Sequence, residues 1–420
     1  MSDDLSYCDV LVIGGGASGM MAALRAGELG KRVTLVEKNA KLGKKLFITG
    51  KGRCNLTNAC PVSDIFDNIL SNSKFMYSAI NRFSNADVMT FFEERGVKLK
   101  TERGDRVFPV SDHSSDVIKA LETGLENLDT DIRLDTEAKE LIIEDGVCRG
   151  AVIRAAGKKT CYIYAKSVIV ATGGLSYPAT GSTGKGYSFA EKAGLDVLKT
   201  FPGLVPFEVY GNICRELQGL TLKNVKISIT DDDREVYKCK APGEMLFTHF
   251  GVSGPLILTA SSGIEKGLIK NGLVLHIDMK PALSNDELEQ RILRDFNENP
   301  NKEYKNSLKR LLPAKMIPVI TALSGIDPCK KVNVITAGER KKMAGMMKDL
   351  SLKIKGTRGY EEAIITRGGI SVKELDPKTF GAKKIKGLYF IGEVIDVDTC
   401  TGGFNLQIAW STGYAAGSFA

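Results

Sequence analysis

The sequence predicts an α/β protein built on a doubly wound parallel sheet, interrupted by an inserted domain of different construction. Three observations support this fold class. An apolar run at 8–13 leads into a glycine-rich turn and a helix. Further apolar runs end in small residues at 167–174 and 388–393, a pattern typical of parallel strands that are buried on both faces. The alternation of strand and helix stops near residue 195, which indicates the insertion.

The glycine-rich turn has the spacing of a dinucleotide-binding motif. Gly14, Gly16 and Gly19 form Gly-x-Gly-x-x-Gly, and residues 20–29 form a small-residue helix. These glycines permit a tight turn, the approach of backbone N–H groups to a pyrophosphate, and close packing of the helix. Glu37 ends the second apolar run, where its carboxylate can accept the hydroxyls of an adenosine ribose. Because that carboxylate would repel a 2′-phosphate, FAD or NAD is favoured over NADP.

Three more glycine-rich loops are candidates for the same ligand, since a doubly wound sheet binds at the carboxyl ends of its strands. The loop at 44–58 carries lysine and arginine, which suit phosphates or a reduced flavin, although a basic surface loop has the same composition. The loop at 171–186 could lie against a wide planar group or be a plain turn. In the third loop Glu393 is a candidate acceptor for a ribityl hydroxyl, and the helix opening at Gly403 could direct its N–H groups at a flavin ring.

The rest of the chain is expected to contain both helices and strands. Residues 75–83 and 85–95 are predicted to be helical, and 131–159 to form short strands with turns. Beyond residue 195 the sequence predicts a small antiparallel unit and then amphipathic helices. The strands are expected at 225–230, 235–239 and 273–278, and the helices at 288–296, 304–312 and 337–350.

Composition narrows the class of protein. The 420 residues are 43% hydrophobic, and no apolar run approaches the ~18 residues of a membrane span. The net charge of +8 is spread over short pairs, so nucleic-acid binding is not expected. Nine cysteines without Cys-x-x-Cys spacing suit reduced thiols, and residues 1–4 are acidic, so a cytoplasmic location is expected. Asp396 and Asp398 have no evident third ligand, so no metal site is expected.

Four motifs carry a resemblance to a known family. TGKGRCNLTN, GGLSYPATGSTGKGY, MLFTHFGVSGP and GEVIDVDTCTGGFNLQIAWSTGYAAG occur in order along the chain. Together they resemble the BaiN-type family, also called the aminoacetone-oxidase-like flavoproteins. The chain departs from that pattern at Lys185, where members usually carry Asp, and at 399–400, where many have Gly.

The resemblance implies a glutathione-reductase-type, Rossmann-like FAD-binding domain made of residues 1–194 and 366–420. It also implies an inserted substrate domain at 195–365, with a β-barrel-like part at about 195–280 and 351–365 and a helical part at about 281–350. The motifs and the resemblance together place the following residues around FAD: Gly14, Gly16, Ala17, Ser18, Glu37, Lys38, Lys44, Thr49, Gly52, Arg53, Asn55, Ala138, Thr172, Gly173, Gly174, Gly392, Glu393, Gly402, Gly403, Phe404 and Asn405.

The expected activity is an FAD-dependent reductase that takes hydride from NAD(P)H and reduces an unsaturated, enone-like small molecule, such as a steroid-like compound. Because the chain has no second Gly-x-Gly-x-x-Gly, NAD(P)H would dock transiently beside the flavin. His249 is the candidate proton donor, and a structural histidine is the alternative reading. Two other functions stay open: an amine oxidase that uses oxygen, and an FAD-containing RNA-modifying or redox-sensing protein. The sequence leaves the oligomeric state open.

Overall fold

The computed structural model describes residues 5–232, 234–269 and 272–420, and residues 1–4, used above for the expected location, lie outside these ranges. The chain divides into two compact units. Unit 1 contains the residues up to Gly203 together with Tyr360–Ala420, and unit 2 is Leu204–Gly359. Each unit has a hydrophobic core of its own.

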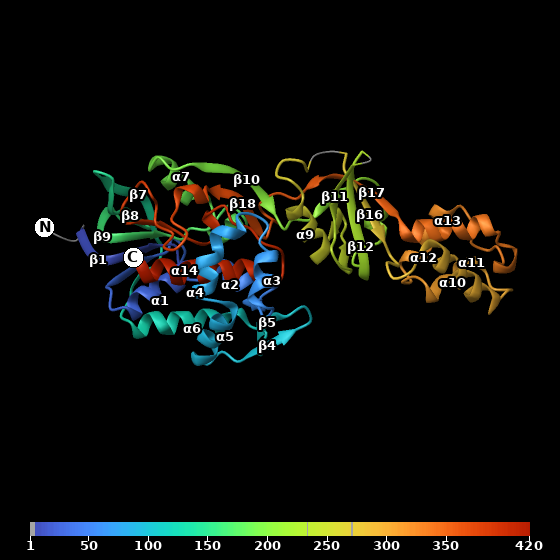
Figure 1. The fold of residues 1–420 in the computed structure, drawn as a ribbon, viewed down its shortest axis with the longest axis horizontal. Helices are drawn as coiled ribbons and strands as arrows, with labels where there is room; N and C mark the ends of the chain where they lie inside the picture. Colours follow the sequence, from blue (N-terminus) through green and yellow to red (C-terminus); the bar gives the residue numbers. More distant parts are fainter. Residues whose placement is uncertain (1–4, 233, 270–271) are drawn as a thin grey trace. The chain divides into compact units, whose positions relative to one another are not determined.

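Unit 1 is built on a seven-stranded sheet (Figure 1). Five of its strands are parallel, and the dinucleotide motif follows the first of them. The parallel strands are β1 (Leu5–Ile13), β2 (Val33–Val36), β6 (Asp131–Arg133), β9 (Thr160–Val170) and β19 (Leu388–Phe390), and the antiparallel ones are β7 (Thr136–Glu144) and β8 (Val147–Ala155). Their order is β6-β2-β1-β9-β8-β7, and β19 pairs with the carboxyl end of β9. Because Ile13 of β1 pairs with Val170 of β9, the loops that follow these two strands begin side by side.

Helices α1 (Ala17–Glu28) and α14 (Phe404–Phe419) pack closely together in unit 1. A Cβ atom at Gly413 would lie 2.5 Å from the carbonyl oxygen of Ser18, and one at Gly417 would lie 2.5 Å from that of Ala22. The small residues therefore let the C-terminal helix contact the helix of the dinucleotide motif directly. The other helices of unit 1 are α2 (Lys44–Ile48), α3 (Val62–Asp67), α4 (Tyr77–Arg82), α5 (Asn85–Glu94), α6 (Ser114–Asn127) and α7 (Lys185–Lys192).

Unit 2 combines a closed barrel with a group of helices. The barrel order is β12-β14-β15-β11-β17-β16, β16 pairs back onto β12, and β13 is attached at β12. These strands are β11 (Phe207–Val209), β12 (Thr221–Asp231), β13 (Arg234–Lys238), β14 (Gly243–Phe247), β15 (Gly251–Ser253), β16 (Val274–Asp278) and β17 (Leu350–Thr357). The helices are α8 (Ile213–Glu216), α9 (Pro255–Gly263), α10 (Asn285–Asn297), α11 (Tyr304–Ser307), α12 (Met316–Ser324) and α13 (Ala337–Lys348).

Two details differ from the sequence-based expectation. Residues 195–203 and 360–365 belong to unit 1 rather than to the insertion, because β10 (Val197–Gly203) pairs with β18 (Ile365–Ile370). The helix expected at 304–312 is short and continues as a 3₁₀ turn at Leu308–Arg310. Pro313 follows closely and disfavours helical geometry in the residue before it.

Within the ranges that the structure describes, no helix has both the length and the apolar character needed to cross a membrane.

The cysteines of this fold are expected to differ sharply in reactivity. Cys54 is fully buried, and burial raises the pKa of its thiol to about 12, whereas Cys329 is exposed. Since the thiolate is the reactive form, a maleimide added to the native protein at neutral pH should modify Cys329 first and leave Cys54 unmodified. Peptide mass mapping checks this, with the urea-unfolded chain as the control in which both react. Modification of both at equal rates in the native protein would contradict the burial of Cys54.

Candidate FAD site

The loop after β1 has the geometry that its three glycines predict. Gly14 has a φ of +109°, and a Cβ atom there would lie 2.5 Å from the carbonyl oxygen of Ala171. A Cβ atom at Gly19 would lie 1.9 Å from the carbonyl oxygen of Gly14. Both positions therefore exclude a side chain, the first because of the turn and the second because α1 packs against the loop.

Gly16 differs from its neighbours because the space beside it is open. It is the N-cap of α1, and no atom lies within 4 Å of the position of a Cβ atom. The first N–H groups of a helix have no acceptor within the helix and carry partial positive charge. The N-terminus of α1 thus offers donors and free space for a pyrophosphate.

Glu37 follows β2 and fixes this loop. Its Oε2 accepts a hydrogen bond from the N–H of Gly15 at 2.7 Å. Its Oε1 accepts hydrogen bonds from the N–H and the side-chain amide of Asn39, at 2.8 Å and 2.6 Å. The carboxylate is nearly buried and faces the cavity described next, so it is placed to accept ribose hydroxyls.

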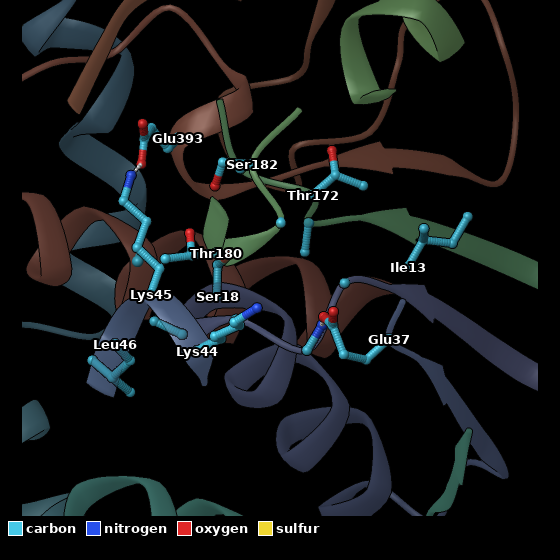
Figure 2. Close-up of a pocket in the computed structure, with 18 of the residues that line it drawn as sticks. Ile13, Ser18, Glu37, Lys44, Lys45, Leu46, Thr172, Thr180, Ser182 and Glu393 are labelled. Atoms are coloured by element: carbon cyan, nitrogen blue, oxygen red, sulfur yellow. Dashed lines mark hydrogen bonds and ion pairs between the residues drawn. The ribbon is translucent and has the colours of Figure 1, made fainter. Parts of the chain in front are cut away.

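A cavity in unit 1 joins the carboxyl ends of the parallel strands to the first turns of α1, α2 and α14 (Figure 2). It brings together most of the residues predicted around FAD. Those that line it are Gly14, Gly16, Ala17, Ser18, Glu37, Lys38, Lys44, Thr49, Ala138, Thr172, Gly173, Glu393 and Asn405.

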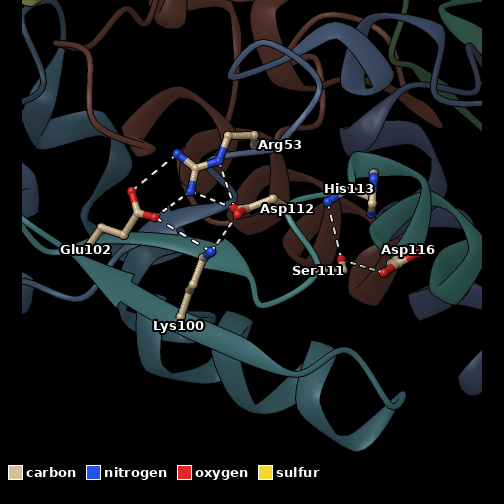
Figure 3. A network of polar contacts seen from close by, with 7 residues as sticks. All are labelled: Arg53, Lys100, Glu102, Ser111, Asp112, His113 and Asp116. Carbon is tan, nitrogen blue, oxygen red and sulfur yellow. Dashed lines mark hydrogen bonds and ion pairs between the residues drawn. The ribbon is translucent and has the colours of Figure 1, made fainter.

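Arg53 does not line this cavity, in contrast to the prediction. Its guanidinium forms ion pairs with Glu102 at the end of β4 (Leu99–Glu102) and with Asp112, which also pairs with Lys100 (Figure 3). It also lies over the ring of Phe108, 4.2 Å from its centroid. These carboxylates raise the pKa of Arg53, and Arg53 in turn lowers the pKa of Glu102. Two acids on a neighbouring strand and loop thus hold the guanidinium, and the contact of Arg53 with FAD stays a prediction.

Seven other predicted residues are not among those that line the cavity. Side-chain atoms at Gly174 and Gly392 would collide with Thr366 and Ser18, so these glycines serve packing. The same holds for Gly403, where a Cβ atom would lie 2.3 Å from the carbonyl oxygen of Thr57. The remaining ones are Gly52, Asn55, Gly402 and Phe404, and of these Phe404 packs into the core.

His249 lies in unit 2, in the turn between β14 and β15. Its side chain is exposed and contacts the ring of Phe250 edge-on. It is not among the residues lining the cavity of unit 1. Its role as a proton donor therefore stays a prediction.

Several lining residues were not predicted. Lys45 is the most notable, because its ammonium contacts Glu393 in the cavity wall. Sequence reasoning chose the adjacent Lys44, and only the turn of α2 decides which lysine faces which group. The others include Thr136, Ala171, Thr180, Ser182, Thr366, Val397 and Leu406. Thr136 and Ala171 lie close in sequence to the predicted residues Ala138 and Thr172, and this proximity is the signal by which the sequence could have indicated them.

The residues present fit FAD. The open space at Gly16 suits a pyrophosphate, and Glu37 suits the ribose beside it. Thr172 also lines the cavity, and its buried Oγ1 has no hydrogen-bond partner in the described part of the chain.

A doubly wound domain with this dinucleotide cavity defines the class of protein as an FAD-dependent oxidoreductase with a Rossmann-type domain, which confirms the predicted fold class. The particular family follows from comparison. The family described as "HI0933-like protein Rossmann domain" matches residues 8–419, and the chain belongs to it. This agrees with the BaiN-type resemblance.

Two curated proteins and one solved structure are similar to this chain. The chain is 32% identical to a ribosomal RNA dihydrouridine synthase of Escherichia coli, over 97% of this chain and 96% of that one. It is 29% identical to a 3-dehydro-bile acid delta(4,6)-reductase of Clostridium scindens, over 97% of both chains. Among solved structures, a 3-ketosteroid delta1-dehydrogenase of Sterolibacterium denitrificans has the same fold. Its TM-score is 0.52 at 14% identity, and 98% of this chain and 99% of that chain are covered.

Glu37→Gln is expected to weaken FAD binding. The amide can accept at only one of the two positions at which the carboxylate now accepts, so the loop and the ribose lose charge-assisted hydrogen bonds worth about 1.5–3 kcal/mol. The dissociation constant for FAD should rise about tenfold to a hundredfold, as measured by fluorescence titration of the apoprotein. Glu144→Gln, on the exposed end of β7, is the matched control and should bind FAD normally. If the two variants bound FAD with equal affinity, Glu37 would not be part of the FAD site.

Proposed function

We propose that this protein uses NAD(P)H and FAD to saturate a carbon–carbon double bond that is conjugated to a carbonyl group. The two relatives described above support one reaction class. Dihydrouridine is formed from uridine by saturating a ring double bond conjugated to a carbonyl, and a delta(4,6)-reductase of a 3-dehydro-bile acid acts on double bonds conjugated to the 3-ketone. Each saturation adds a hydride to the double-bond carbon farther from the carbonyl (the β-carbon of a simple enone) and a proton to its neighbour.

When bound, FAD would supply the hydride chemistry by accepting two electrons and a proton from NAD(P)H and passing them to the β-carbon. The chain's own residues would bind and orient it. The N-terminus of α1 and the space at Gly16 hold the pyrophosphate, and Glu37 holds the ribose. The exposed His249 is our candidate for the proton that reaches the α-carbon.

Uridine in RNA is the first candidate substrate. The observation that carries this choice is the 32% identity to an RNA-directed enzyme over nearly the whole of both chains. The distribution of charge also supports it, because nearly all of the net charge of +8 resides in residues 204–359. A positively charged unit attracts the phosphate backbone of RNA. This choice reverses the expectation drawn from the scattered charge pairs.

A steroid-like enone is the second candidate, favoured by the bile acid relative at 29% identity. Anaerobic mixing of the purified FAD-loaded protein with NADH or NADPH, followed by unmodified ribosomal RNA or a 4-en-3-one steroid, tests the proposal. Flavin bleaching by the nicotinamide and its return on adding one of the two substrates are expected. Mass spectrometry should then find a gain of two hydrogens in uridine or in the steroid. Bleaching by a simple amine and not by NAD(P)H would overturn the proposal in favour of an amine oxidase.

A further inference from the structure

An ion pair lies in the wall of the FAD cavity, and none of the roles assigned above uses it. The Nζ of Lys45 lies 2.5 Å from Oε2 of Glu393, and both residues line the cavity. Lys45 also donates a hydrogen bond to Oγ of Ser176 at 2.6 Å. The pair is only partly exposed, with 25% and 21% of the side-chain surfaces accessible.

Glu393 is held in place by two further donors. Ser176 donates to its Oε1 at 2.5 Å, and the N–H of Thr366 donates to the same oxygen at 2.9 Å. The carboxylate of Glu393 is therefore held in a fixed position by donors other than Lys45. With these partners, its predicted contact with a ribityl hydroxyl stays a prediction.

The pair lies at the end of the cavity where the redox-active ring would be. Glu37 and the N-terminus of α1 would hold the ribose and pyrophosphate of FAD, and the flavin ring would then lie farther along the cavity. Figure 2 shows Lys45 and Glu393 together on the side of the cavity opposite Glu37. Thr366, whose N–H donates to Glu393, also lines the cavity.

A hydride equivalent adds one negative charge to the cofactor, so nearby charges change the balance between its oxidised and reduced forms. A cation stabilises the reduced form and an anion destabilises it. In a partly buried cavity these effects are stronger than in water. Lys45 and Glu393 act in opposite directions, and in the intact pair they largely cancel.

We propose that Lys45 and Glu393 together set the reduction potential of FAD in this cavity, with Lys45 raising it and Glu393 lowering it. This inference rests on the proposed FAD-dependent function. Glu393 also holds the ammonium of Lys45 in place, and Ser176 and Thr366 hold the carboxylate of Glu393. The arrangement allows a single substitution to move the potential either way without altering the fold.

The test is the midpoint potential of FAD in the holoenzyme, measured by dye-coupled reductive titration without NAD(P)H or substrate. Lys45→Met should weaken binding of reduced relative to oxidised FAD at least tenfold, which is about 30 mV lower for a two-electron couple. Glu393→Gln should shift the potential upward by a similar factor, and the double variant should return close to the parent value. Lys192→Met removes an exposed charge that pairs with Glu140 and is the matched control with no shift.

A merely structural pair gives a different pattern. Shifts of the same sign in both single variants, or shifts below twofold with normal FAD content, would overturn the inference while leaving the proposed function intact. Lys45→Gln keeps a polar group beside Ser176 and replaces Lys45→Met if that variant loses FAD; it should lower the potential likewise. A parent protein that binds no FAD would overturn the proposed function and this inference together.

Discussion

Gly16→Ala is expected to give a folded protein that no longer retains FAD. Gly16 has a φ of −84° and no atom within 4 Å of the position of a Cβ atom, so alanine fits the protein itself. The methyl group would fill the space through which phosphate oxygens reach the N–H groups of α1. Loss of two such charge-assisted hydrogen bonds, at about 1.5–3 kcal/mol each, corresponds to at least about a hundredfold weaker binding. FAD content after purification and titration of the apoprotein measure it.

Gly19→Ala should lose FAD for a different reason, because it disturbs the apoprotein. Alanine is favoured over glycine in a helix interior by about 1 kcal/mol. Here its Cβ atom would lie 1.9 Å from the carbonyl oxygen of Gly14, so α1 must move away from the loop. We expect a lower free energy of unfolding, measured by circular dichroism in urea.

Gly345→Ala in α13 is the control for both glycine variants. No atom lies within 4 Å of its Cβ position, so it should be neutral or stabilising. If Gly19→Ala were as stable as Gly345→Ala, the close packing of α1 on the loop would be refuted. If Gly16→Ala retained FAD at the parent affinity, the pyrophosphate would have to bind elsewhere.

The part of the site that the sequence predicts best is the part that local chemistry determines. Gly14, Gly16, Gly19 and Glu37 lie within one βαβ unit, and their spacing alone defines a turn, a helix terminus and a ribose acceptor. The strands at 167–174 and 388–393 were predictable for a similar reason, since an uninterrupted apolar run requires burial on both faces.

What the sequence could not predict depends on residues far apart in the chain. The contacts of Arg53 with Glu102 and Asp112 were not predicted, because no periodicity links a loop arginine to acids some fifty residues away. Lys45 and Glu393 are 348 positions apart, so their pairing becomes visible only when α2 and the loop after β19 meet. The predicted boundary between the two units was misplaced for the same reason. The strand β10 belongs to unit 1 because it pairs with β18, which lies far along the chain.

Arg367→Met is expected to destabilise unit 1 by about 3–5 kcal/mol, the usual cost of removing one partner of a buried ion pair. Arg367 on β18 lies 3.3 Å from the carboxylate of Asp398, and their side chains are only 8% and 1% exposed. Burial lowers the pKa of Arg367, whereas the nearby Asp398 opposes this shift. Without the guanidinium, Asp398 would remain as a buried carboxylate lacking its cation.

The fluorescence of Trp410, the chain's one tryptophan, can follow this loss in a urea titration. Trp410 is fully buried in α14 of unit 1 and donates a hydrogen bond to the carbonyl oxygen of Leu56 at 2.9 Å, so it reports on the unit that contains the pair. The double variant Arg367→Met with Asp398→Leu removes both charges and should recover most of the lost stability, because apolar groups can replace a buried pair at little cost. If the double variant were as unstable as Arg367→Met alone, the loss would come from the packing of the arginine stem against Gly203 and not from the stranded charge.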